Sequence, residues 1–193
     1  LGTKRLFFGR KAIEIQGATA EETRFASVIG IKEYPPLTGP GLLDGLLQSR
    51  QEFILSQSFS LVDKPVALER MDRLQRQIGV SDEGGTALQS DLDVARDQLV
   101  KAEAVFGQHH LSLLCLSRSL DELDRVVSDL GSSMTEMNIN WVREDLNQEA
   151  AFWAQLPGNE RYIARSSLIS SRNFAGFVSL HNFAAGQRDG THW

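Results

Sequence analysis

The chain has 193 residues, of which 41% are hydrophobic and 23% charged, as in a globular protein with one large domain or one domain and an appendage. Its net charge of −5 argues against a nucleic-acid-binding role, because such binding depends on Lys and Arg neutralising phosphates. The single cysteine, Cys115, excludes an internal disulfide and suggests a reducing compartment. The apolar run 113–116 around it is far shorter than the ~20 residues that span a bilayer.

Residues 1–62 predict a strand-helix-strand unit preceded by a hairpin. Two short apolar runs, 4–8 and 11–16, flank Gly9 and Arg10 and predict the hairpin. The β-branched and aromatic stretch 25–34 predicts a strand that ends at Pro35-Pro36, since a central strand does not tolerate proline. A short helix with leucines at helical spacing follows in 42–47, and an alternating apolar pattern predicts a second strand over 52–62.

Residues 63–106 predict an antiparallel helical hairpin. Asp63 is a good N-cap, and Pro65 lies in the first helical turn, where its missing N–H costs little. Apolar residues then recur at helical spacing up to Ile78, and again as a heptad seam: Leu88, Leu92, Ala95, Leu99, Ala102 and Phe106. The other faces are charged, and they include a row of arginines, Arg70, Arg73 and Arg76. Such a face is usually solvated; the alternative is an arm that docks a partner through this row.

Residues 107–158 predict a second strand-helix-strand unit. An apolar strand is expected over 109–117, with Leu111, Leu113 and Cys115 on one face. Ser119 and Glu122 form a capping box that begins a helix whose inward side chains would be Leu120, Leu123, Val127, Leu130 and Met134. A strand over 137–143 and a helix over 147–155 follow. The sequence therefore predicts an α+β fold, a ferredoxin-like split β-α-β antiparallel sheet with the helical hairpin inserted between its halves.

Residues 159–193 form an aromatic, glycine-punctuated segment without a clear period. Disordered segments are poor in aromatic residues, so we expect this one to wrap back on the sheet. The segment stops abruptly at Thr191-His192-Trp193, which suggests a chain cut from a longer protein.

The patterns that carry chemistry are missing from the sequence. None of the five lysines follows a glycine, so the P-loop Gly-x-x-x-x-Gly-Lys-Ser/Thr is absent. His109 and His110 are adjacent on a predicted strand and point to opposite faces, one toward solvent and one toward the core, so metal binding is not expected. We therefore assign no catalytic, cofactor-binding or metal-binding residue.

The residue types favour a role in binding other proteins, because aromatic and Arg residues are enriched at interface hot spots. The candidate interface residues are Arg70, Arg73, Arg76, Trp153, Arg165, Arg172 and His181. An alternative is a small enzyme on a ferredoxin-like scaffold that binds a phosphate-bearing ligand through Arg165, Arg172 and His181. A pocket that joins those three side chains would favour the alternative.

The tail carries a resemblance to a known family. Its pattern is FWAQLPGN from Phe152, ISSRNFA from Ile169, HNF from His181, and then Gly186 and the final His192-Trp193. This pattern resembles the segment that precedes the motor domain in the type IV secretion and conjugation ATPases, the CagE/TrbE/VirB family, and is most similar to its VirB-type members. The strand 25–34 with Pro35-Pro36 also resembles the first domain of the family, so the resemblance covers nearly the whole chain.

The resemblance implies a large ATPase at the cytoplasmic face of the bacterial inner membrane that powers pilus assembly and the export of DNA or protein. ATP and Mg would bind in a C-terminal RecA-like domain, which would also form a hexamer. This chain resembles only the N-terminal part, which would dock the motor onto a small transmembrane subunit and scaffold subunits of the inner-membrane complex. The expected units are 1–62, 63–106, 107–158 and a bridging segment, 159–193, that leads to the motor.

Overall fold

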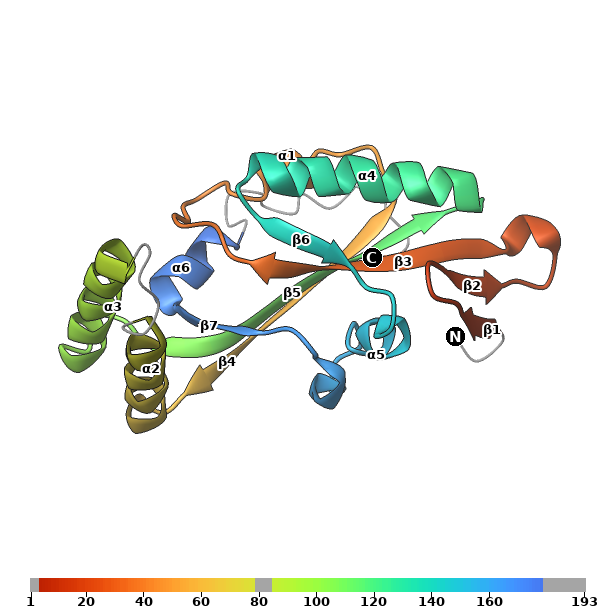
Figure 1. The fold of residues 1–193 in the computed structure, drawn as a ribbon. Helices are drawn as coiled ribbons and strands as arrows, with labels where there is room; N and C mark the ends of the chain where they lie inside the picture. The colour runs from red at the N-terminus through yellow and green to blue at the C-terminus, as the bar shows by residue number, and fades with distance from the viewer. Residues whose placement is uncertain (1–3, 79–84, 179–193) are drawn as a thin grey trace, which may run out of the picture.

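A computed structural model describes residues 4–78 and 85–178 of the chain (Figure 1). One antiparallel sheet holds seven strands. The strands are β1 (Arg5–Phe8), β2 (Ile13–Gln16), β3 (Arg24–Glu33), β4 (Phe53–Val62), β5 (Phe106–Ser117), β6 (Asn140–Arg143) and β7 (Ser167–Ser170). The helices are α1 (Asp44–Leu47), α2 (Lys64–Ile78), α3 (Gly85–Val100), α4 (Leu120–Glu136), α5 (Gln148–Trp153) and α6 (Ser171–Gly176), with 3-10 turns at Ala20–Glu22 and Glu160–Tyr162.

The order of the sheet is β1-β2-β3-β5-β4, and two short strands extend its inner members. β6 pairs with β3 beyond the point where β2 leaves it, from Ile29 opposite Arg143 to Glu33 opposite Asn140. β7 pairs with the first four residues of β5, whereas β3 pairs with its last part. All ten residues of β4 pair with the other side of β5, from Phe106 to Cys115. The long strands β3, β4 and β5 therefore form the centre on which the other elements assemble.

Helices cover both faces of the sheet, and each face has its own core (Figure 1). α4 lies along one face with Leu123, Val127, Leu130 and Met134 buried, and they pack against apolar residues of β3 and β5 in the largest cluster. The opposite face packs the β1–β2 hairpin and α5 around Phe152. The alternation of side chains along β5 sends Leu113 and Cys115 to the first core and Leu114 to the second, as expected for a strand that is buried on both sides.

The beginning of α4 follows its predicted signals with two differences. Ser119 Oγ accepts a hydrogen bond from the backbone N–H of Glu122, as in a capping box. The Glu122 carboxylate, however, accepts from the N–H of Arg118 and so fixes the residue before the cap. Leu120, expected to point inward, is 52% exposed, and Val126 is buried instead. The apolar stripe of α4 therefore begins at Leu123.

The predicted second helix of the hairpin is too long at its C-terminal end. α3 ends at Val100, Ala102 adopts a positive φ of 57°, and Phe106 is the first residue of β5. A left-handed residue ends a helix because it turns the chain away from the helical path. Phe106 still packs with Leu99 and Met71, so the heptad pattern identifies a true apolar contact but extends the helix across a turn.

The C-terminal segment is more regular than its sequence suggests. Ser167–Ser170 forms β7 on β5, and Ser171–Gly176 forms α6, whose N-cap Ser170 accepts a hydrogen bond from the Asn173 N–H. The ring of Phe174 stacks on Phe59 of β4 with centroids 4.4 Å apart. Up to residue 178 the segment therefore returns to the sheet. Residues 179–193, which include His181, lie outside the described part.

Candidate docking surfaces

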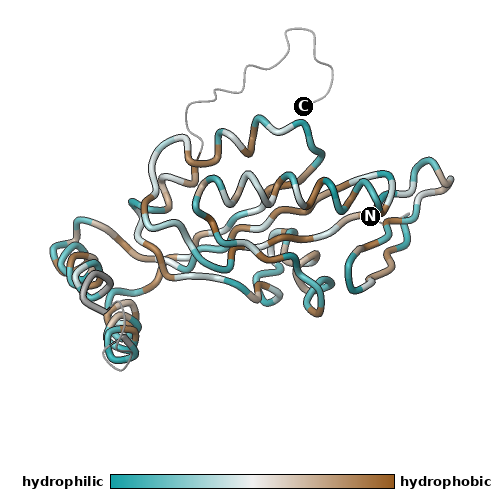
Figure 2. Tube along the Cα trace, turned by 45° about the horizontal axis from the view of Figure 1, so that its top comes forward, coloured by the Kyte–Doolittle hydropathy of each residue, from teal (hydrophilic) through white to brown (hydrophobic). Residues whose placement is uncertain are grey.

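The helices α2 and α3 pack against each other and run antiparallel. Lys64 Nζ, at the start of α2, donates to the carbonyl of Val100 at the end of α3. Further along, Asp72 pairs with Arg96, and Gln75 Nε2 donates to Asp93 Oδ1 at 3.3 Å. Their shared apolar contact consists of Ala67, Met71, Leu99 and Phe106, with Ala95 and Leu168 packed against it. Figure 2 shows polar and apolar segments alternating along both helices, as on amphipathic helices.

A groove of about 490 Å³ lies between this helix pair and the strand-helix unit of β7 and α6. Its apolar lining includes Met71, Phe106 and Leu168, and its charged lining residues are Arg70 and Asp91. Leu74 and Val94 also line it and remain 42% and 54% exposed. An apolar hollow with charged residues of both signs has the composition of a protein-binding surface.

The three arginines predicted as a docking row have different environments. Arg70 is exposed and lines the groove. Arg73 lies 3.7 Å from the Glu69 carboxylate one turn earlier, and Arg76 Nε donates to the backbone carbonyl of Asp72. Exposed pairs of this kind contribute ~0–1 kcal/mol each. Of the three arginines, Arg70 is therefore the one that lines the groove.

The candidate residues of the C-terminal third are dispersed. Trp153, on α5, is half-buried against Phe8 and Phe152, with ring centroids 6.3 and 5.3 Å away. Arg165 pairs with Glu144 at the end of β6, whereas Arg172 lies 3.7 Å from Glu103, before β5. The two arginines thus bind different carboxylates. They do not share a pocket, as the alternative of a phosphate-binding enzyme requires.

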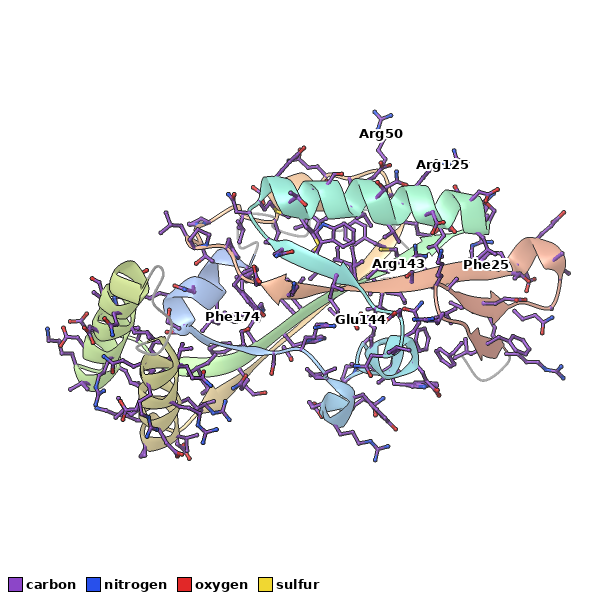
Figure 3. The ribbon with its side chains drawn as sticks, viewed as in Figure 1. Phe25, Arg50, Arg125, Arg143, Glu144 and Phe174 are labelled. Carbon is purple, nitrogen blue, oxygen red and sulfur yellow. The ribbon has the colours of Figure 1, made fainter. Side chains whose placement is uncertain are left out.

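A buried polar cluster lies under α5, and no sequence pattern indicated most of its members. Arg165 Nε donates to Glu144 Oε1 at 2.5 Å, and the Glu144 side chain is 6% exposed. His110 Nδ1 lies 2.8 Å from the backbone carbonyl oxygen of Arg165, and His110 Nε2 lies 3.1 Å from Ser112 Oγ. Gln155 Nε2 donates to the same hydroxyl at 2.7 Å. Figure 3 shows Arg143 and Glu144, neighbours in sequence, directed toward opposite faces of the sheet.

The two adjacent histidines are both buried, so the expectation that one would face solvent is wrong. His109 lies on the α4 face, 3.0 Å from the Tyr34 hydroxyl and 3.3 Å from Gln57 Oε1, and His110 lies on the α5 face. Burial lowers the pKa of His109 to about 4, and it also lowers the pKa of His110. Burial raises the pKa of the Cys115 thiol to about 12. These groups are neutral at physiological pH and serve as core residues.

Within residues 4–78 and 85–178, no three His, Cys, Asp or Glu side chains are grouped so that they would hold a metal ion. In the same part of the chain, none of the helices combines the length and apolar character needed to cross a membrane.

The fold and these surfaces define an α+β protein with an amphipathic helix pair beside an open groove. The chain belongs to the family described as "CagE, TrbE, VirB family, component of type IV transporter system", whose model matches residues 1–165. The family inferred from the tail pattern and the first strand is thereby confirmed.

Proteins similar to the chain come from several bacteria. It is 43% identical over 190 residues, 98% of its length, to the type IV secretion system protein virB4 of Bartonella henselae. It is 36% identical over all its residues to the type IV secretion system protein PtlC of Bordetella pertussis, and 35% identical over the same length to virB4 of Brucella suis. These alignments cover 24%, 23% and 23% of the relatives, so the chain spans about a quarter of their length.

Proposed function

We propose that this chain is an assembly and docking domain of a type IV secretion ATPase. The motor that hydrolyses ATP with Mg would lie in another part of the longer protein, consistent with the quarter of its relatives' length that the chain spans. The longer protein would form hexamers and energise pilus assembly and the export of DNA or protein. Its partners would be the small transmembrane subunit and the scaffold subunits at the cytoplasmic face of the inner membrane.

The groove beside α2 and α3 is the observation that carries the docking role. Leu74 and Val94 line the groove and stay exposed. They are not needed for the contact between the two helices, which is formed by Met71 and Leu99. A partner that covers such exposed apolar side chains would gain about 25 cal/mol of binding free energy for each Å² of apolar surface buried. Arg70 and Asp91 supply charges of both signs that would orient the partner.

The fold supports a finer assignment within this proposal. The strand order β6-β3-β5-β4, with α1 after β3 and α4 after β5, supports the assignment of a split β-α-β sheet of the ferredoxin-like type. The pair α2–α3 follows β4 and precedes β5, and thus has the position of an insertion between the two halves. We assign the insertion, residues 63–106, as the docking arm and residues 159–193 as the bridge toward the motor.

A substitution in the groove tests the docking role. In the longer protein, Val94→Asp would place a charge in the groove, and Val100→Asp is its matched control. Val100 is 53% exposed on the same helix, close to the 54% of Val94, but does not line the groove. We expect the Val94 variant to lose co-purification with the inner-membrane complex and to lose export, and the Val100 variant to retain both.

ATP hydrolysis by the purified longer protein should be unchanged in both variants, which separates docking from the motor. Equal export and co-purification by the two variants would contradict the assignment of the groove. The isolated chain of 193 residues should neither bind nor hydrolyse ATP. Nucleotide turnover by it that a point substitution abolishes would contradict the proposed division of labour.

A further inference from the structure

β4 is the long outer strand of the sheet. Its ten residues pair with β5 from Phe53 opposite Cys115 to Val62 opposite Phe106, and the strand order ends with β4 (Figure 1). The other strands at the margins of the described sheet, β1, β6 and β7, have four residues each. A long edge presents a row of backbone N–H and C=O groups to a further strand, whereas a very short edge does so weakly.

The sequence of β4 lacks the usual protection of an exposed edge. Its residues are FILSQSFSLV, without a charged side chain or a proline. Ile54 and Leu61 are 50% and 72% exposed. Native edge strands are commonly protected by Lys, by Pro or by bulges, because an apolar and uncharged edge associates with other strands. An edge that is left both long and uncharged is therefore suited to pairing.

We propose that β4 pairs antiparallel with β4 of a second copy of this chain, about a twofold axis through Ser58. The contact joins two sheets into one continuous sheet. It goes beyond the docking function proposed above and does not depend on it, because it uses the opposite side of β5 from β7 and none of the groove residues.

The two faces of β4 restrict the register. Phe53, Leu55 and Phe59 pack with the α4-face core, while Ser56 and Ser58 line a cleft of about 200 Å³ on the other face. Residues opposite each other in an antiparallel pair share one face of the sheet. A twofold axis perpendicular to the sheet satisfies this condition only when it passes through a residue, which excludes axes placed between residues.

Centring the axis on Ser58 brings three pairs of similar side chains opposite each other. Ile54 then lies opposite Val62, Leu55 opposite Leu61, and Ser56 opposite Ser60. The exposed Leu61 is covered by an apolar partner, whereas Gln57 lies opposite Phe59.

The neighbouring register is less favourable. Centring the axis on Gln57 pairs Phe53 with Leu61 and Leu55 with Phe59. It also sets the exposed Ile54 against Ser60 and leaves Glu52 opposite Val62, without an opposite charge. In the Ser58 register, Glu52, just before the strand, also falls toward Lys64 of the other copy, so opposite charges flank both ends. Both registers pair apolar residues across the axis, but the Ser58 register also pairs Ile54 with Val62 and the flanking opposite charges, which favours a second copy in that register over an unrelated strand.

Single introduced cysteines test the register. The native Cys115 is buried and has a raised pKa, so it does not compete. In the proposed dimer Ser58→Cys lies opposite itself, within the ~4.5–5.5 Å Cβ separation of directly opposed residues, and should form a disulfide-linked dimer under mild oxidation of the 193-residue chain. Ser60→Cys alone lies opposite Ser56 and should not. A mixture of Ser56→Cys and Ser60→Cys chains should cross-link, which provides the matched positive control.

A charged edge tests the association itself. We expect the chain to dimerise by analytical ultracentrifugation and Leu61→Lys to weaken the dimer by at least about tenfold, since the ammonium would face Leu55 of the partner. Leu61 is mostly exposed, so the unfolding midpoint should be unchanged. A chain that stays monomeric at near-millimolar concentration would overturn the proposal and leave the edge to a strand of another subunit. Cross-linking through Ser60→Cys alone as fast as through Ser58→Cys would also overturn it.

Discussion

Arg165 donates from Nε to Oε1 of Glu144 at 2.5 Å and so ties the segment after α5 to the end of β6. The partners differ in exposure: the Glu144 side chain is 6% exposed and that of Arg165 is 41% exposed. The backbone of Glu144 is also fixed, because its N–H donates to the carbonyl of Val28. The acid is thus the buried member of the pair and the arginine covers it from the solvent side.

This difference in burial predicts unequal effects of the two substitutions. Arg165→Met would leave a buried carboxylate without its cation and should lower the free energy of unfolding by ~1–3 kcal/mol. Glu144→Gln removes the charge together with the need for a partner and should cost less. Urea unfolding of both variants and of the double variant would measure the difference. Equal losses from the two single substitutions would contradict the argument.

Strands and helices that carry their own pattern were predictable from the sequence. Alternation along β4, the proline pair after β3 and the cap at Ser119 each act within a few residues, and all three elements occur where expected. β7 was not predicted, because Ser167–Ser170 has no alternation of its own. It becomes a strand because the pairing of β3 with β5 stops at Gly30 opposite Ser112, which leaves the backbone groups at the start of β5 to be paired.

The site residues were harder to predict for a similar reason. Arg70 was predicted from its row on α2, but the groove that it lines depends on β7 and α6. Glu144 follows a short strand as an ordinary acid, and its partner Arg165 is distant in sequence. Its burial results from the packing of α5 and of the following segment on the sheet, which no local pattern encodes.

Gly131 marks the close approach of α4 to β6, and its substitution should be costly. A Cβ at this position would overlap the indole of Trp141, whose Nε1 donates to Thr135 Oγ1 at 3.1 Å and is therefore held in place. We expect Gly131→Ala to lower the free energy of unfolding by ~1–3 kcal/mol, the cost of overpacking a core. Thermal unfolding would detect the change.

Gly45 in α1 is the matched control, because a Cβ there would meet no atom within 4 Å. Gly45→Ala should be neutral or stabilise the protein by about 0.4–1 kcal/mol, since alanine reduces the entropy of the unfolded chain. A Gly131 variant as stable as the Gly45 variant would show that Trp141 moves aside without cost.

The cap of α4 should contribute measurably to stability. Ser119 Oγ satisfies the N–H of Glu122, and Ser119→Ala should cost ~1 kcal/mol. Ser132, exposed on the same helix, is the control, and Ser132→Ala should be neutral or slightly stabilising because alanine is the better helix former. Denaturant midpoints of the two variants provide the comparison. A midpoint for Ser119→Ala equal to that of the native chain would exclude a contribution from the cap.

His109 should make the stability of the protein depend on pH in a defined window. The His109 ring is enclosed by polar partners: Nε2 lies 3.3 Å from Gln57 Oε1, and Nδ1 lies 3.0 Å from the hydroxyl of Tyr34, which donates to the His109 carbonyl. Because burial lowers the pKa of His109 from 6.5 to about 4, the unfolded chain takes up the proton first as the pH falls. Stability should therefore decline as the pH falls from about 6.5 toward 4.

The variant His109→Gln tests this dependence, since an amide keeps hydrogen-bonding capacity but does not titrate. Its free energy of unfolding, measured by urea at successive pH values, should fall less steeply than that of the native chain over the same window. The lowered pKa of His110 contributes a separate decline that remains in the variant. The lowered pKa values of Asp124 and Asp145 add a decline that begins at about pH 5 and that also remains in the variant. Parallel curves for the variant and the native chain would show that folding does not shift the pKa of His109.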